Sequence, residues 1–319
     1  MTTLTKTIVA TGASSGLGFE LVKQLLTQPS PSLSSRSSSS SSSSSLAYRI
    51  ILGARDVAGT QAAFDALSYD RTRHSLTVLP LELGDLAGTR SFARESLRAI
   101  GGSKESEGKE EGKLDYLLLN AGITGGNSAE RRGPWGWCEA LVVNHLSQHY
   151  LVHLFREKLV QSKSRVVFVS SGAIRQVSDT ASLEEDVKAG SGVEPFKTYS
   201  QTKFIQLLGA HWWRRQLKEQ GTVVAVSPGL IPGTGLGRGA GVDMSKVPMA
   251  DAQPISIGAQ SILRAFTRDD FPEDPQQIFL TSWGEWWSKE VYGLTLEKEL
   301  QDKWCPSKEE IEKEAGLID

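Results

Sequence analysis

The chain has 319 residues, 39% hydrophobic and 23% charged, with a formal net charge of −2. This nearly balanced charge gives no electrostatic case for nucleic-acid binding. Cys138 and Cys305 are too far apart in sequence to indicate a disulfide framework, and they lack the spacing of a metal site. No apolar stretch reaches 18 residues, and a strand starting by Thr7 leaves no room for a leader peptide. We therefore expect a cytoplasmic protein without a transmembrane segment or a bound metal.

The first predicted strand, 7–10, leads directly into a glycine-rich turn and a helix. The turn reads Thr11-Gly12-Ala13-Ser14-Ser15-Gly16-Leu17-Gly18. Apolar residues follow at helical steps of three and four. This order places backbone N–H groups and a helix N-terminus against a phosphate. Glycines are needed because side chains would keep a pyrophosphate from the backbone, so the segment predicts dinucleotide binding.

Two hydrophilic insertions lengthen the chain. Residues 30–45 are almost entirely serine, and residues 101–113 are rich in Gly, Glu, Lys and Ser. Neither has apolar surface to bury, so we expect a disordered segment and a charged, solvated loop, respectively. Both fall between a helix and the next strand, opposite the ligand crevice of a doubly wound sheet, and should be catalytically silent.

Strands and helices alternate along the rest of the chain. Further strands are predicted at 49–54, 76–81, 114–119, 165–170 and 222–227, and long helices at 136–160 and 198–219. This alternation predicts an α/β fold, a single doubly wound Rossmann-type parallel sheet with helices on both faces. We expect residues 1–319 to form one domain.

Tyr199 and Lys203 stand at i and i+4 on the predicted helix 198–219, and therefore on the same face. A phenol has a pKa of about 10. An ammonium one turn away lowers that pKa, so that the tyrosine can act as a general acid or base on a hydroxyl or carbonyl. A solvated helix face would also explain the pair, and its significance depends on the surrounding motifs.

Those motifs occur in the order and spacing of a known family. They are Thr11-Gly12-x-x-x-Gly16-x-Gly18, Asn120-Ala121-Gly122, Asn144, Ser171, Tyr199-x-x-x-Lys203 and Pro228-Gly229. From residue 6 to about residue 287 the chain resembles the short-chain dehydrogenase/reductases. The segments 81–86, 143–146 and 227–236, together with the wide gap between Ser171 and Tyr199, resemble the branch of retinol dehydrogenases and protochlorophyllide reductases.

The resemblance implies a role for each matching residue. Tyr199 would exchange the proton, Ser171 would bind the substrate oxygen, Lys203 would bind the nicotinamide ribose, and Asn144 would hold a water in a proton relay. Alternatively, Ser171 terminates a strand and Asn144 caps or kinks a helix. The implied cofactor contacts are Gly12, Ser14, Ser15, Gly16, Leu17, Gly18, Asp85, Leu86, Asn120, Ala121, Gly122, Tyr199, Lys203, Pro228, Gly229, Ile231 and Thr234.

Arg55, directly after the second strand, indicates which nicotinamide cofactor is bound. NAD usually calls for an acidic residue at this strand end, and here Asp56 comes one residue too late. The guanidinium of Arg55 suits a ribose 2′-phosphate, so we expect NADP(H), with an ordinary surface arginine as the alternative. The threonine that the family often has four residues after the Pro-Gly glycine is Gly233 here, so the carboxamide contact either shifts to Thr234 or is lost.

Four further features complete the expectations, and the last three have two interpretations each. The glycine-rich segment 230–249 should form a mobile lid that selects substrate, and residues 230–319 form the lid and C-terminal segment. Residues 172–198 either cover the site or form an exposed loop. The tryptophans after residue 280 either line a pocket or fill the core. Trp212-Trp213 belongs either to the core or to the four-helix dimer interface that the family forms.

These observations predict an NADP(H)-dependent oxidoreductase. It would transfer hydride between nicotinamide and a carbonyl/alcohol pair of a moderately large apolar small molecule, with Tyr199 as general acid/base. Reduction of an activated C=C bond is the alternative reaction. A non-catalytic dinucleotide-binding protein is the alternative class, which the intact Tyr199 and Lys203 disfavour.

Overall fold

The computed structural model describes residues 4–27, 46–101, 112–126, 128–237 and 252–318. The predictions for the serine segment 30–45, for most of 101–113 and for 238–249 of the lid lie outside these residues.

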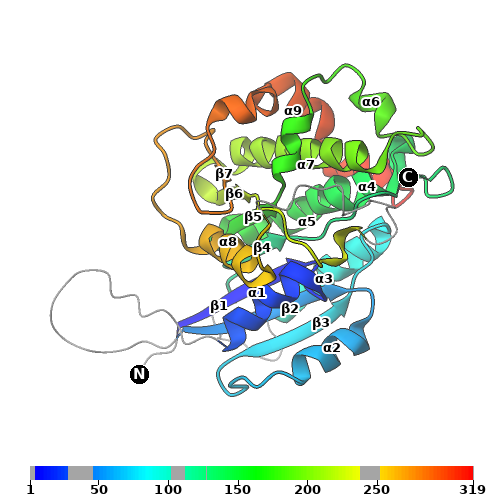
Figure 1. Cartoon of the computed structure of the whole chain (residues 1–319). Coiled ribbons are helices and arrows are strands. Elements are labelled where there is room, and N and C mark those ends of the chain that lie inside the picture. Colours follow the sequence, from blue (N-terminus) through cyan, green and yellow to red (C-terminus); the bar gives the residue numbers. More distant parts are fainter. Residues whose placement is uncertain (1–3, 28–45, 102–111, 127, 238–251, 319) are drawn as a thin grey trace.

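Seven parallel strands form one sheet in the order β3-β2-β1-β4-β5-β6-β7 (Figure 1). They are β1 (Leu4–Thr11), β2 (Leu46–Ala54), β3 (Ser75–Pro80), β4 (Tyr116–Leu119), β5 (Arg165–Val169), β6 (Thr222–Val226) and β7 (Phe279–Leu280). The chain starts in the middle, builds outward to β3 and returns to pair β4 with β1. Ligand crevices lie at such a reversal, outside the carboxyl ends of the strands. The predicted doubly wound parallel sheet is confirmed.

Helices cover both faces of the sheet because successive strand residues point to opposite sides. On β1, Ile8 and Ala10 pack with α1, α2 and α8, whereas Val9 packs with α3, α5 and α7. The helices are α1 (Gly16–Thr27), α2 (Val57–Asp65), α3 (Leu86–Gly101), α4 (Glu139–Leu141), α5 (Ser147–Ser162), α6 (Leu183–Asp186), α7 (Pro195–Leu217), α8 (Ile255–Thr267), α9 (Lys298–Trp304) and α10 (Lys308–Glu314). No described helix is both long and apolar enough to cross a membrane.

The predicted helix 136–160 is wrong at its N-terminal end. Trp137 is extended and forms a β-bridge with Lys188, and the Cys138 N–H donates to the Val187 carbonyl. The helix therefore begins only at Glu139, in α4. It continues through a π-helical turn, Val142–Leu146, into α5. A contact with a segment about fifty residues away overrides the local helical pattern.

The C-terminal segment packs on the outer faces of α5 and α7 (Figure 1). Tyr150 of α5 donates to Glu312 of α10 at 2.6 Å, and Arg215 of α7 pairs with Asp302 of α9 at 2.5 Å. Trp213 is buried among these elements and belongs to the core. The resemblance implies a dimer interface on this helix pair, and here residues of α9 and α10 lie against α7 and α5, respectively.

Candidate active site

The glycine-rich turn lies at the carboxyl end of β1 and begins α1. A Cβ added to Gly12 would lie 2.5 Å from the Cα of Ala121, so glycine is required for the turn to pack on the end of β4. Gly16 has a positive φ of 58°, and among the described residues an added Cβ there would meet only Thr234, at 3.7 Å. The Gly16 side of the turn is therefore open toward Thr234. Ser14 and Ser15 are exposed at the N-terminus of α1, so this turn fits a phosphate group.

Asn120 ties the ends of β1 and β4 together. Its side-chain amide donates to the Gly12 carbonyl at 2.7 Å, and the Thr11 hydroxyl accepts from the backbone N–H groups of Asn120 and Ala121. The side chain of Asn120 is thus committed to the shape of the turn, which leaves Ala121 and Gly122 as the open part of this predicted contact segment.

Tyr199 and Ser171 meet at the carboxyl edge of the sheet. Ser171 follows β5 and begins a 3₁₀ turn, Gly172–Gln176, where its hydroxyl accepts from the Ala173 N–H at 3.1 Å. Tyr199, in the second turn of α7, is only 7% exposed. Burial raises the pKa of the Tyr199 phenol, and a hydrogen bond with Ser171 opposes that rise. The predicted Ser–Tyr pair is thus brought into contact, whereas the lowering of this pKa by Lys203 stays a prediction.

Lys203 lies one turn after Tyr199 and is buried, with only 3% of its surface exposed. Nζ donates to the Val169 carbonyl at 2.8 Å and to Gln206 Oε1 at 3.1 Å. Burial lowers the pKa of Lys203 to about 7, so at neutral pH it is poised between amine and ammonium. A Cβ placed on Gly122 would lie 3.3 Å from Nζ, so the absence of a side chain there leaves the ammonium accessible on that side.

Asn144 lies in the π-helical turn and faces the same place. Its Oδ1 accepts from the Ile123 N–H at 2.8 Å, and its amide donates to the Ile123 carbonyl and to the Thr202 hydroxyl, both at 2.9 Å. A Cβ on Gly122 would lie 3.5 Å from Asn144 Oδ1. Asn144 and Lys203 therefore flank the same side of Gly122, although Asn144 also holds α7 against the end of β4.

Two glutamines extend this arrangement, and the sequence analysis missed both. Gln206 Nε2 donates to Gln148 Oε1 at 3.1 Å, and Gln148 Nε2 donates to the carbonyls of Ala121 at 2.7 Å and Val143 at 3.0 Å. All are buried. We call Lys203, Gln206 and Gln148 the lysine cluster. Helix spacing was the available signal, because Gln206 is three residues after Lys203 and Gln148 is four after Asn144.

The residues predicted to select the nucleotide lie at the ends of β2 and β3. Arg55 is 80% exposed on its side chain, and its Nε lies 3.9 Å from Glu82. The neighbouring Asp56 caps α2 by accepting from the Gly59 N–H at 2.8 Å, so it is already engaged. Asp85 accepts from the Ala87 N–H at the start of α3, and Leu86 is buried in the core.

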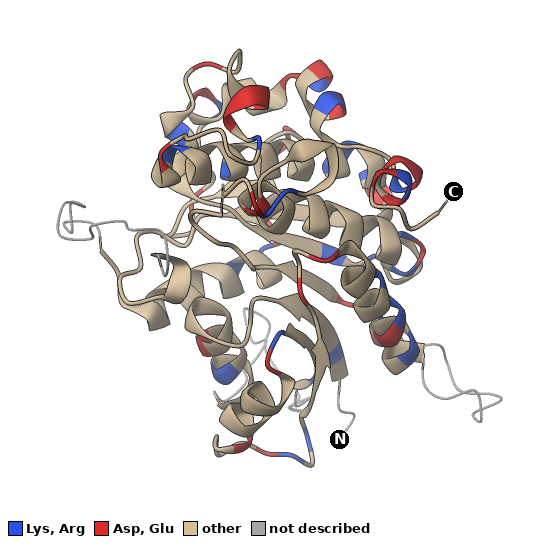
Figure 2. Cartoon of the chain, turned by 90° about the vertical axis from the view of Figure 1, so that its right-hand side faces the viewer, with Lys and Arg blue, Asp and Glu red and all other residues tan. Residues whose placement is uncertain are grey.

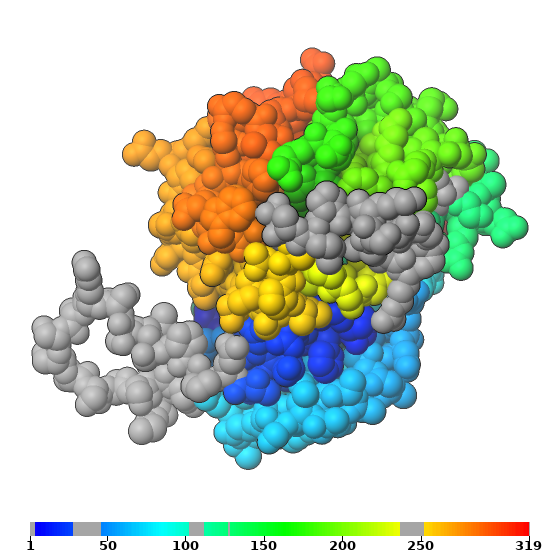
Figure 3. Space-filling view, viewed as in Figure 1, coloured from blue at the N-terminus to red at the C-terminus, as the bar shows by residue number. Residues whose placement is uncertain are grey.

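The turn after β6 lies beside the turn that carries Ser171. Gly229 has a φ of 88°, and Ser227 accepts from the Gly172 N–H at 3.0 Å, which joins this turn to the one that carries Ser171. Ile231 and Leu17 both pack against Gly258 of α8, and Figure 3 shows α8 in contact with the N-terminal part of the chain. Thr234 donates to the Ile231 carbonyl at 3.3 Å.

Residues 172–198 and the tryptophans after residue 280 each had two interpretations, and the structure places them in different surroundings. Residues 172–198 pack beside α7, where Asp186 pairs with Lys197 at 2.9 Å. A cavity of about 340 Å³ lies between this segment and the start of α7. Trp304 is core, whereas Trp283 is 65% exposed. Phe196, one turn before Tyr199, is also exposed and stacks with it at 6.4 Å between ring centroids.

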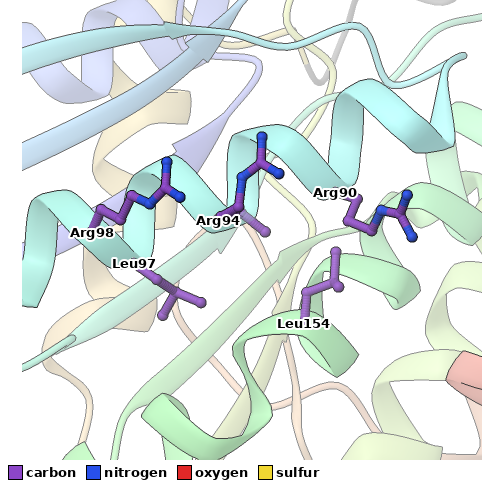
Figure 4. A pocket seen from close by; sticks show the side chains of 6 residues that line it. Arg90, Arg94, Leu97, Arg98 and Leu154 are labelled. Carbon is purple, nitrogen blue, oxygen red and sulfur yellow. The ribbon is translucent and has the colours of Figure 1, made fainter.

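A groove of about 430 Å³ between α3 and α5 lies apart from these residues. Figure 4 shows Arg90, Arg94 and Arg98 in a row along α3, with Leu97 and Leu154 below them. None of the predicted site residues lines it. Figure 2 shows basic and acidic segments interspersed on this side of the molecule.

Helices α5 and α7, with the π-helical turn before α5, carry a second polar group, which we call the histidine cluster: His145, His149, His153 and Trp213. His153 is half-buried and the other three are buried. His145 donates to the Trp304 carbonyl at 2.7 Å and His149 to the Pro306 carbonyl at 2.9 Å, while Trp213 donates to His149 Nδ1 at 2.9 Å. Burial lowers the pKa of His145 and of His153 to about 4, and that of His149 as well.

The doubly wound sheet, with an open glycine turn and a Ser–Tyr–Lys group at its carboxyl edge, defines a Rossmann-type α/β protein. No family model matches the chain. It is 53% identical over 314 residues to a short-chain dehydrogenase/reductase of Pestalotiopsis microspora, covering 97% of this chain and 99% of that protein. Retinol dehydrogenase 14 of Mus musculus is 29% identical, over 73% of this chain and 63% of that protein.

Solved structures agree with the sequence comparison. The NADPH-bound carbonyl reductase from chicken fatty liver aligns with a TM-score of 0.59 and 19% identity, over 90% of this chain and 95% of that one. The short-chain dehydrogenase of Sphingobium yanoikuyae in complex with NADPH aligns with a TM-score of 0.58 and 18% identity, over 86% and 87%. The chain belongs to the short-chain dehydrogenase/reductase family of oxidoreductases.

Proposed function

We propose that the protein is an NADP(H)-dependent oxidoreductase. It transfers hydride between nicotinamide and a carbonyl/alcohol pair of a moderately large apolar substrate, and Tyr199 is the general acid/base. The observation that carries this proposal is the buried Tyr199 phenol, one helical turn from Lys203 and close enough to Ser171 for that hydroxyl to oppose the rise of its pKa, at the carboxyl edge of the sheet.

Each residue of this group then has a task. The bound nicotinamide would supply or accept the hydride. Ser171 orients the substrate oxygen, and Tyr199 donates a proton to it in reduction or removes one in oxidation. Because burial raises the pKa of Tyr199, the phenol is protonated at neutral pH, which suits the acid that carbonyl reduction requires. Lys203 and Asn144, which lie on the same side of Gly122, would return the proton from solvent.

The preference for NADP(H) rests on Arg55. Its guanidinium is exposed at the end of β2, where Glu82 lies 3.9 Å from its Nε. The neighbouring carboxylate of Asp56, which could accept from a ribose 2′-hydroxyl, already accepts from the Gly59 N–H as the cap of α2. The NADPH complexes of two structural neighbours support the same cofactor. We assign the remaining contacts to the open turn around Gly16 and to the turn that carries Ile231 and Thr234.

An apolar substrate is supported by the aromatic surface near the site. Phe196 stacks on Tyr199 while leaving 45% of its own surface exposed, and Trp283 is exposed in the turn after β7, at the ligand edge of the sheet. We infer a cytoplasmic enzyme. A homodimer stays a prediction, and it would have to use faces other than those of α5 and α7 that residues 298–314 cover.

Calorimetric titration of the wild-type protein and of Arg55→Ala with NADPH and with NADH tests this proposal. The variant should bind NADPH about 10- to 100-fold more weakly, because a hydrogen-bonded charge pair is lost. NADH affinity should change by less than about twofold, because NADH has no 2′-phosphate.

Arg94→Ala, which removes an exposed arginine from α3, is the matched control and should change neither affinity. Equal losses for both cofactors would discard the 2′-phosphate contact. If the wild-type protein bound neither cofactor, the proposed function itself would be wrong.

A further inference from the structure

The hydrogen bonds of the lysine cluster determine which end of each glutamine side chain donates and which end accepts. Gln148 Nε2 donates to two backbone carbonyls, those of Ala121 and Val143. A carbonyl only accepts, so both carbonyls require the NH₂ end of this side chain, and Gln148 must turn its oxygen toward Gln206. The end of β4 thereby sets the orientation of a side chain on α5.

That orientation passes to the next residue. Because Gln148 presents an oxygen, Gln206 must present its NH₂ group to it, and its own oxygen then points at Lys203 Nζ. The fold therefore determines that the oxygen of Gln206, and not its NH₂ group, lies beside the Lys203 ammonium. Gln148 and Gln206 are completely buried, so water does not compete for these bonds.

Lys203 has no other strong stabilisation. Its ammonium has three hydrogens, of which the Val169 carbonyl and Gln206 take two. Among the described residues no carboxylate pairs with it, and burial alone shifts its pKa. The third hydrogen is left for the open side at Gly122, where the site would receive the cofactor.

We propose that Gln206, oriented by Gln148, is a positioning residue that directs the Lys203 ammonium toward Gly122 and stabilises it as a cation. This rests on the proposed function for the use of Lys203 in the reaction, but the contact itself belongs to the protein alone. Gln206 touches neither substrate nor cofactor. It acts through Lys203 by supplying a neutral acceptor that favours the ammonium over the amine.

The test measures the protonation of Lys203 in the protein without cofactor. Lysines are labelled with ¹³C at Cε, Lys203 is assigned by its absence in Lys203→Met, and its signal is followed against pH by NMR. Gln206→Met, which keeps the volume but removes the acceptor, should lower the pKa of Lys203 by about one unit or more. Gln206→Glu, which places a carboxylate there, should raise it by at least as much.

Gln148→Met should also lower this pKa, by less, because Gln206 loses its fixed orientation. The matched control is Gln161→Met. Gln161 accepts from Lys158 at 2.8 Å with the same three-residue spacing on an exposed helix face, so Lys203 should titrate as in the wild type. Shifts of opposite sign in the two Gln206 variants support the proposal, since a purely structural residue would move both in the same direction or not at all.

An unmoved Lys203 in folded Gln206→Met and Gln206→Glu would overturn the proposal. Calorimetric titration with NADPH separates this outcome from a failure of the proposed function. If the wild-type protein fails to bind NADPH while the opposite pKa shifts occur, the function is wrong and the positioning role stands. If NADPH binds and the shifts are absent, the positioning role of Gln206 is wrong and the proposed function stands.

Discussion

The lysine cluster and the histidine cluster lie on the same pair of helices, α5 with its preceding π-helical turn and α7, and both are largely buried. In both, a chain of side-chain hydrogen bonds crosses between the two helices. The two clusters differ in the groups at which this series of hydrogen bonds ends. The lysine cluster ends in an ammonium that borders the open side of Gly122, whereas the histidine cluster ends on the carbonyls of Trp304 and Pro306.

This difference shows that a strongly shifted pKa does not by itself mark an active site. Burial shifts the pKa of Lys203 and of His149 alike. His149, however, uses both ring nitrogens within the protein, so it holds the C-terminal segment in place and has nothing left for a ligand. We assign chemistry to the first cluster and stability to the second.

The largest expected effect is a loss of activity when the lysine of the lysine cluster is replaced. Lys203→Met should lower NADPH-dependent turnover about 100-fold or more, because the ammonium that serves Tyr199 is lost. Lys197→Met, on the exposed first turn of the same helix, is the control and should stay within about twofold of wild type. Steady-state NADPH oxidation reports both, and undiminished turnover in Lys203→Met would place Lys203 with the structural residues.

Local patterns in the sequence predicted the sheet and its glycine-rich turn, whereas the roles of Ser171, Tyr199 and Lys203 were predicted from the order of motifs that the chain shares with a known family. The first strand and its glycines lie within a dozen residues, and in a doubly wound sheet every strand end reaches the same edge. The extended Trp137 was missed because its place depends on Lys188, far along the chain. The Gln148–Gln206 contact joins residues 58 positions apart, and no local pattern on either helix shows that they face each other.

The second prediction concerns stability alone. His149→Leu should lower the free energy of unfolding by about 1–3 kcal/mol, because it leaves the buried Trp213 N–H without its acceptor and removes one of the two histidine donors to the Pro306 carbonyl. NADPH affinity should not change. His153→Leu should cost less, since His149 still satisfies Pro306. Denaturant titration measures both, and a loss of NADPH binding in folded His149→Leu would contradict the separation of the two clusters.

The third prediction uses pH. Folded-state pKa values of about 4 for His145 and His153 and about 3 for His211 lie below the unfolded value of about 6.5. The unfolded chain therefore binds more protons below pH 6.5. Stability should consequently be fully present above that pH and fall as the pH drops toward 4.

His211 offers a clean variant for this prediction, because it stacks on Tyr292 and its Nε2 has no hydrogen-bond partner within the part of the chain that the structure describes. His211→Phe should flatten the dependence by up to about 1.4 kcal/mol per pH unit, the value of one proton. The free energy of unfolding, measured between pH 4 and 7, tests this. Identical slopes in wild type and variant would mean that His211 is not buried in its neutral form.

The central claim is that Tyr199 exchanges the substrate proton in an NADPH-dependent reaction. Its most direct test is NADPH oxidation by wild type and Tyr199→Phe with a panel of aldehydes, ketones and enones, alongside calorimetric titration of both proteins with NADPH. We predict that wild type reduces at least one carbonyl, and that the variant loses turnover about 10²- to 10⁴-fold while its NADPH affinity stays within about twofold. Equal turnover by the two proteins would contradict the claim.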